Sequence, residues 1–145
     1  MSDADGDAER RLFAVDAALG SKAKSSLSDE EWVFLDVWSL ESEINNGGFS
    51  QYFLNSSGRN AGRIASSLKR IGADHCAKIV AQALELVDHP TLDWGDDGAR
   101  QEAVRRLGVL GEEKLETLDE QFLAYPDDLS ALLDRFVTAH ATTFG

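Results

Sequence analysis

The stretch EINNGGFSQYFLNSSG, residues 43–58, decides how this chain folds. Two asparagines and two glycines interrupt an apolar pattern there, and an aromatic run follows at once. Before the interruption, apolar side chains recur at i, i+4, i+7 and i+11, as one face of a helix requires, at Val33, Val37, Leu40 and Ile44. Asparagine and glycine tolerate the left-handed backbone that ends a helix. The stretch therefore predicts a corner between two helices at residues 45–48.

The residues around this corner predict a polar network. Phe49, Tyr52 and Phe53 are spaced to share the apolar face of a second helix, whereas Gln51 and Asn55 lie on another face. A buried network of such side chains must be fully hydrogen-bonded, and it then fixes the angle between the helices. The alternative is a ligand pocket that uses the same amides. The complete motif comprises Glu41, Glu43, Asn45, Asn46, Gly47, Gly48, Phe49, Gln51, Tyr52, Phe53, Asn55 and Gly58.

Helical spacing continues along the rest of the chain. Ser28 and Glu31 form a capping-box pattern that starts the first long helix near Asp29. Apolar stripes predict further helices that contain residues 64–71, 76–87, 115–122 and 129–137, with shorter helices over 8–19 and 99–107. Convincing strand alternation is absent. We therefore expect an all-α fold, a single-domain compact bundle of about six to eight helices over residues 1–145, with residues 1–8 as a flexible acidic N-terminus.

Composition limits the classes of protein that this sequence can encode. A chain of 145 residues with 43% hydrophobic residues fits one domain that folds alone. Its single cysteine excludes an internal disulfide and a multi-cysteine zinc site. No apolar run approaches the roughly 20 residues that span a membrane, and the acidic start, MSDADGDAERR, does not resemble a signal peptide. These features predict a cytoplasmic protein that does not interact with membranes.

The net charge is the strongest global signal of function. The chain carries a formal net charge of -12, divided into -7 over residues 1–57, +4 over 58–80 and -9 over 81–145. Such a field repels nucleic acid and attracts basic partners. We therefore expect no direct binding to nucleic acid. The basic island between the acidic flanks pairs either with those flanks internally or with a second copy across a homodimer interface.

Two stretches carry a resemblance to a known family. The order LESEINNGGFSQYFLNSSG, followed by SLKRIGADHCAKIV, resembles the acidic DNA-mimic protein family of small helical bacterial proteins, and the match covers roughly Trp32 to Val80. A member of that family presents carboxylates in place of DNA phosphates and occupies the DNA-binding surface of a transcription factor. The resemblance implies the same mode of action here. The motif marks the fold, whereas the mimicking carboxylates lie outside it and do not carry over residue by residue.

An acidic helix downstream is the candidate for the mimicking surface. Its carboxylates fall away from the apolar positions of residues 115–122, and adjacent turns place them roughly 5–6 Å apart, similar in scale to the charge spacing of a nucleic acid. Like charges four residues apart cost about 0.2–0.5 kcal/mol per pair, so they do not stabilise the helix. The alternative is an ordinary solvated face. The predicted partner-binding residues are Glu112, Glu113, Glu116, Asp119, Glu120, Asp127 and Asp128.

Patterns typical of enzymes are weak in this sequence. His75 and Cys76 are neighbours, and neighbouring side chains on a helix point about 100° apart. DWGDDG, residues 93–98, departs from a calcium loop at its second ligand and ends with Val104 in place of glutamate, so it is interpreted as a turn and helix cap. We predict no catalytic residue, cofactor or metal site. The leading hypothesis is a non-enzymatic DNA mimic that binds a basic DNA-binding protein, such as a transcription factor. The alternative is a small-molecule-binding or catalytic helical domain at the Asn45–Asn55 corner.

Overall fold

The fold is built around one long, broken helix. The computed structural model describes residues 3–144, which contain eight α-helices, two 3-10 helices and no strand. This confirms the all-α prediction. In chain order the elements are α1 (Asp3–Gly20), η1 (Lys24–Ser26), α2 (Asp29–Leu54), η2 (Ser56–Arg63), α3 (Ile64–Arg70), α4 (Asp74–Val87), α5 (Asp97–Arg105), α6 (Gly108–Leu123), α7 (Leu129–Ala139) and α8 (Ala141–Phe144).

The predicted capping box starts α2. The Glu31 backbone N–H donates to Ser28 Oγ at 3.2 Å, and the Ser28 N–H donates to Glu31 Oε1 at 2.9 Å. Glu31 is buried, and its second oxygen accepts a 2.6 Å hydrogen bond from Lys22 Nζ. The first turn therefore has its free backbone donors satisfied by side chains that the sequence places three residues apart.

The predicted corner lies inside α2. Gly48 has a φ of +75° and a ψ of -173°, a backbone conformation that is essentially restricted to glycine. Gly47 is extended, with a φ of -163°, and Asn45 and Asn46 remain helical. The prediction of a helix corner is confirmed, but only Gly48 takes up the left-handed backbone. A second helical segment then starts at Phe49 and continues to Leu54.

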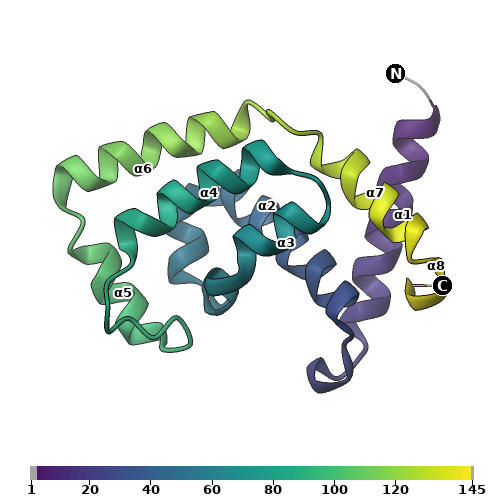
Figure 1. Ribbon diagram of the computed structural model, residues 1–145, viewed down its shortest axis with the longest axis horizontal. Coiled ribbons are helices and arrows are strands. Elements are labelled where there is room, and N and C mark those ends of the chain that lie inside the picture. Colours follow the sequence, from purple (N-terminus) through teal and green to yellow (C-terminus); the bar gives the residue numbers. More distant parts are fainter. Residues whose placement is uncertain (1–2, 145) are drawn as a thin grey trace.

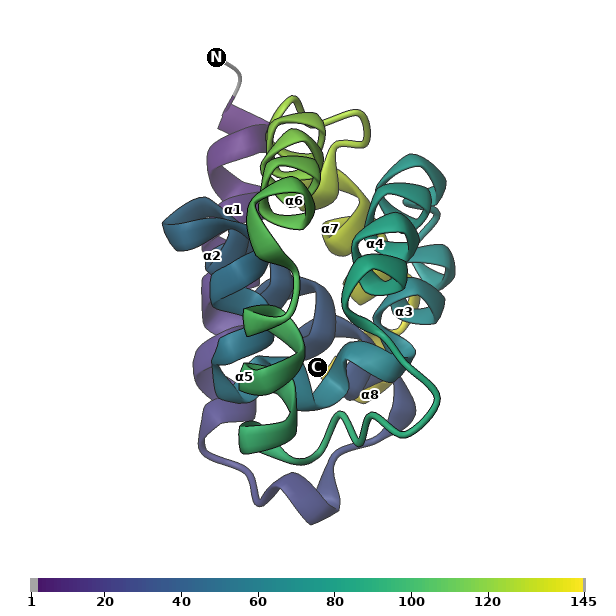
Figure 2. The ribbon, with the colours of Figure 1, turned by 90° about the vertical axis from the view of Figure 1, so that its left-hand side faces the viewer.

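The remaining helices surround α2. Figure 1 places α1, α7 and α8 at one end of the elongated molecule, and α5 with the start of α6 at the other. In the end-on view of Figure 2, α6 lies between α2 and α4, and it contacts both of them. Gly72, with a φ of +86°, separates α3 from α4. The order of the helices thus brings the acidic helix α6 directly over the broken part of α2.

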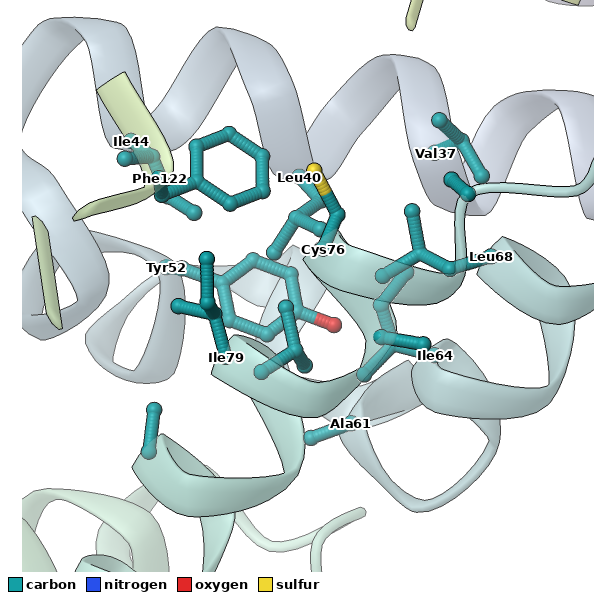
Figure 3. Packing of buried hydrophobic residues seen from close by; sticks show 14 of the residues in the cluster. Val37, Leu40, Ile44, Tyr52, Ala61, Ile64, Leu68, Cys76, Ile79 and Phe122 are labelled. Carbon is teal, nitrogen blue, oxygen red and sulfur yellow. The ribbon is translucent and has the colours of Figure 1, made fainter. Parts of the chain in front are cut away.

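One hydrophobic core joins these elements (Figure 3). Phe49 and Tyr52 from the second segment of α2 are buried, and so are Leu118 and Phe122 from α6. The rings of Phe49 and Phe122 meet edge to face, with their centroids 5.9 Å apart. Cys76 is fully buried in the same core. The apolar faces predicted from spacing therefore meet at the corner itself.

The N-terminal segment differs from the prediction. Residues 3–8, where the sequence predicted a flexible tail, belong to helix α1, while residues 1–2 lie outside the described residues. Helix α1 is held against α7, where Arg11 donates to both carboxylate oxygens of Asp134 at 2.9 and 2.8 Å. Tertiary packing of Leu12 and Leu19 explains why the acidic start continues as helix. Among residues 3–144, no helix combines the length and apolar character needed to cross a bilayer.

Candidate partner-binding site

The amides of the corner are hydrogen-bonded within the chain. Gln51 Nε2 and Asn55 Nδ2 both donate to Glu43 Oε2, at 2.9 and 2.8 Å. Glu43 precedes the break in α2, Gln51 follows it, and Asn55 is the residue that caps the end of α2. The arrangement favours the structural interpretation of the motif over the ligand pocket, because the amide groups that would bind a ligand already have a partner.

A second hydrogen-bond cluster ties the corner to the loop after α6. Tyr125 donates from its hydroxyl to Glu41 Oε2 at 2.9 Å, and it accepts from Asn45 Nδ2 at 2.9 Å. Tyr125 has a φ of +52°, the only positive φ at a non-glycine position in the described residues. No local pattern indicated a role for Tyr125, because its two partners lie 80 and 84 positions away in the chain. Asn46 is exposed and takes no part in either cluster.

A buried arginine from α5 caps the C-terminal end of α2. Arg100 from α5 is fully buried, and its guanidinium donates to the carbonyl oxygens of Phe53, Asn55 and Trp94 as well as to Asp97. It thus satisfies carbonyl groups that a helix end leaves free. A side chain on Gly58 would overlap Arg100 Nε and the neighbouring carbonyl oxygens, which explains the glycine at the end of the motif.

The predicted carboxylates of α6 separate into two groups. Glu112, Glu113, Glu116 and Glu120 are exposed. Asp119 is half-buried, and its Oδ1 accepts a 2.7 Å hydrogen bond from the Phe49 N–H at the broken part of α2. Burial, together with Glu116 and Glu120, raises the pKa of Asp119, although the Phe49 N–H opposes this. Asp119 therefore anchors α6 to the corner while its neighbours face outward.

Asp127 and Asp128 also differ from each other. Asp127 accepts from the Cys76 N–H at 2.8 Å and lies 3.0 Å from His75 Nδ1, so it caps the start of α4. Asp128 is exposed and caps α7 by accepting from the Ala131 N–H at 3.1 Å. Both carboxylates therefore stabilise helix N-termini, where negative charge is favourable, and only Asp128 is exposed.

The basic island pairs largely with the acidic flanks of the same chain. Arg63 donates to both oxygens of buried Asp36, at 2.8 and 3.1 Å. Arg59 pairs with Asp97, and Arg70 lies 3.7 Å from Glu30. Internal pairing, one of the two alternatives for this segment, is therefore present in the monomer. The +4 charge of residues 58–80 is neutralised at its arginines and leaves the acidic surfaces to dominate the field.

The patterns that resembled enzyme sites have structural roles. His75 contacts Asp127, and the Cys76 thiol lies in the core, where burial raises its pKa to about 12. In DWGDDG, Asp96 caps α5 by accepting from the Ala99 N–H at 3.0 Å. Among the side chains that the structure describes, no group of three or more histidine, cysteine or acidic residues is arranged to hold a metal ion.

Comparison with known proteins identifies the family. A family model described as DMP19-like protein matches residues 25–140, which include the whole corner motif and α6. Searches of curated proteins and of solved structures gave no match. The matched region covers well over half of the 145 residues. The chain therefore belongs to the DMP19-like protein family.

Proposed function

We propose that this protein is an acidic DNA mimic that binds a basic DNA-binding protein, specifically a transcriptional regulator, and competes with DNA for it. Family membership over residues 25–140 is the observation that carries the proposal. The net charge of -12 supports it, since such a field attracts the basic surfaces that otherwise contact phosphates. The protein acts by occupying a surface, with no reaction of its own.

The contact surface that we propose contains the exposed carboxylates of α6 and of the loop that follows it. These are Glu112, Glu113, Glu116, Glu120 and Asp128. Asp119 and Asp127 contribute negative charge to the same region while their oxygens hold backbone N–H groups of α2 and α4. The proposed surface thus has exposed charges beside carboxylates that hydrogen bonds hold in place, and such preorganisation lowers the entropy cost of binding.

A DNA-displacement titration tests the proposal. The partner is first captured from the native cell, and labelled DNA bound to it is then displaced by the purified protein. Reversal of Glu112, Glu116 and Glu120 to lysine should abolish displacement, because it turns the negative charges positive. It should leave the helix intact, because these exposed positions lie off the apolar face of α6. Displacement by the unmodified protein should weaken as salt rises, since exposed charge pairs are screened over about 10 Å at 0.1 M salt.

A second triple variant separates the local surface from the overall charge. Glu85→Lys, Asp88→Lys and Asp93→Lys change three exposed acids on and after α4 and alter the net charge by the same amount. This variant should still displace DNA at moderate salt, and circular dichroism should show both variants folded. Full competition by the folded α6 variant would remove α6 from the surface, and binding without salt dependence would contradict mimicry.

A further inference from the structure

A cavity between α1 and α2 combines negative charge with aromatic rings. Its volume is about 540 Å³, within the range of roughly 300–1,000 Å³ found for ligand pockets. The described residues that line it come from α1, α2 and the start of α7, and they include Glu9, Phe13, Asp16, Trp38 and Glu41. None of these residues belongs to the acidic surface proposed above.

The aromatic side of the cavity consists of Trp38, which packs on the core, and Phe13, which is largely exposed. The Trp38 ring stacks on buried Phe34, with centroids 5.5 Å apart and an interplanar angle of 17°. Phe13 meets Trp38 edge to face at 5.1 Å, although 64% of Phe13 is exposed. Packing on Phe34 thus holds the Trp38 ring in place, while the exposed ring of Phe13 lies beside it.

The carboxylates of the cavity have no cationic partner within the described part of the chain, and Glu9 and Glu41 are close enough for their charges to repel. Glu9, Asp16 and Glu41 form no ion pair with any side chain that the structure describes. Burial raises the pKa of Glu41; the Tyr125 hydroxyl opposes this, and the nearby charges of Asp128 and Glu9 add to it. A cation in the cavity would relieve this repulsion, because an opposite charge favours the ionised carboxylate.

A second tryptophan of this chain already binds an arginine side chain. On the same helix, Trp32 lies beneath the Arg63 guanidinium, 4.5 Å from the ring centroid, and Asp36 accepts two hydrogen bonds from that guanidinium. The Trp38 cavity repeats the combination of a tryptophan with carboxylates. Among the described side chains, however, no cation lies over the Trp38 ring.

We propose that the Trp38 cavity binds the guanidinium of an arginine side chain from the partner protein. Arginine suits the site better than lysine, because its planar group stacks on an aromatic ring while its N–H fork donates to carboxylates. A DNA-binding surface supplies such arginines, since they contact phosphates there. This inference rests on the proposed function for the source of the arginine, and the cavity itself can be tested without a partner.

The probe for the test is N-acetylarginine amide, with the neutral isostere N-acetylcitrulline amide as its control. Trp32, Trp38 and Trp94 each give an indole N–H signal in an NMR spectrum of the full chain. Titration with the arginine compound should shift the Trp38 signal in a saturable way and leave Trp94, stacked on Phe53, unchanged. The citrulline compound should not shift Trp38. Equal shifts from both compounds, or equal shifts of all three signals, would overturn the proposal.

Variants then assign the contacts. Asp16→Asn combined with Glu41→Gln should raise the dissociation constant roughly three- to tenfold, as expected for the loss of two partly exposed charge contacts. Phe13→Ala should also weaken binding. Because Phe13 is largely exposed, its replacement should leave the fold intact. Glu85→Gln, which removes one exposed charge outside the cavity, should leave the constant unchanged. Binding by the double variant with unchanged affinity would contradict the site.

A final arm separates this proposal from the proposed function. The double variant and the unmodified protein are compared in the DNA-displacement titration. If the cavity holds a partner arginine, displacement should need a higher concentration of the double variant. Arginine binding at Trp38 with no displacement by either protein would count against DNA mimicry alone, whereas displacement that is unaffected by the double variant would overturn the cavity as a partner site.

Discussion

Asp119 of α6 accepts a 2.7 Å hydrogen bond from the backbone N–H of Phe49, the residue that restarts α2 after its break. The acidic helix α6 is thereby attached to the helix corner through one of its own carboxylates. The bond places a negative charge at the start of a helical segment, where the helix dipole favours it. The corner thus helps to orient α6, the helix that carries the proposed mimicking surface. The same hydrogen bond therefore serves both the fold and the proposed surface.

Substitution of Gly48 should break this attachment. Gly48→Ala forces a side chain into a backbone region restricted to glycine, and its Cβ would collide with the Asp119 carboxylate. We expect a loss of about 3 kcal/mol or more in the free energy of unfolding, from backbone strain and the displaced carboxylate together. Urea denaturation followed by circular dichroism measures it.

Two other glycines provide matched controls. Gly108 also has a positive φ, +66°, but a Cβ there meets no atom within 4 Å. Gly108→Ala should therefore cost only the backbone strain of about 1–2 kcal/mol. Gly20→Ala has neither difficulty and should change stability little. Equal losses at Gly48 and Gly108 would show that the contact with Asp119 does not matter.

Local signals explain how much of the fold could be predicted. The capping box of Ser28 and Glu31, the corner at Gly48 and the apolar stripes depend on residues close in sequence, and each is found as expected. The inward turn of Asp119 also had a local signal. Four residues after Leu115, it lies only about 40° around the helix from that buried side chain, so it stands at the edge of the apolar face.

Long-range contacts explain what could not be predicted. Tyr125 bonds to Glu41 across 84 positions, and Arg100 bonds to Phe53 across 47. Neither residue stands in a periodic pattern that identifies its partner. The helicity of residues 3–8 was missed for the same reason, since the contact of α1 with α7 stabilises a segment whose composition alone suggested a flexible tail.

Arg100 should be the most sensitive charged residue of the fold. Arg100→Met removes the side-chain donor to the carbonyl oxygens of Phe53, Asn55 and Trp94, and only Asn55 O keeps another, the Gly58 N–H. Each buried acceptor that is left without a donor costs about 1–3 kcal/mol, so we expect a loss of several kcal/mol in total. Arg105→Met, on the same helix but exposed, should change the free energy of unfolding by less than about 0.5 kcal/mol. A similar small effect at both positions would contradict the role of Arg100 at the end of α2.

Glu31 should make stability depend on acid pH. Its hydrogen bonds from Lys22 and from the Ser28 N–H lower its pKa from the ordinary 4.5, against the effect of burial. A lowered pKa in the folded state means that the ionised form stabilises the fold, fully above pH 4.5 and progressively less as pH falls through the folded pKa. The difference in unfolding free energy between the unmodified protein and Glu31→Gln should therefore shrink on acidification. A constant difference between about pH 3 and pH 7 would contradict this assignment.

The carboxylates of α6 should cost the protein stability. Glu112–Glu116 and Glu116–Glu120 are like charges four residues apart on an exposed helix face, and each pair destabilises a helix by about 0.2–0.5 kcal/mol. Replacement of all three by glutamine should raise the free energy of unfolding by roughly 0.5–1 kcal/mol at low salt. Most of this gain should disappear at about 1 M salt, where charges are screened within about 3 Å.

The same glutamine variant should lose part of its ability to displace DNA from the partner. Neutral side chains keep the shape of the helix and remove the charge that replaces phosphates, so the loss should be smaller than for lysine at these positions. Opposite changes in stability and displacement are expected only if the charges are retained for binding. A variant that is more stable and displaces DNA as well as the unmodified protein would show that the repulsive carboxylates of α6 do not contact the partner.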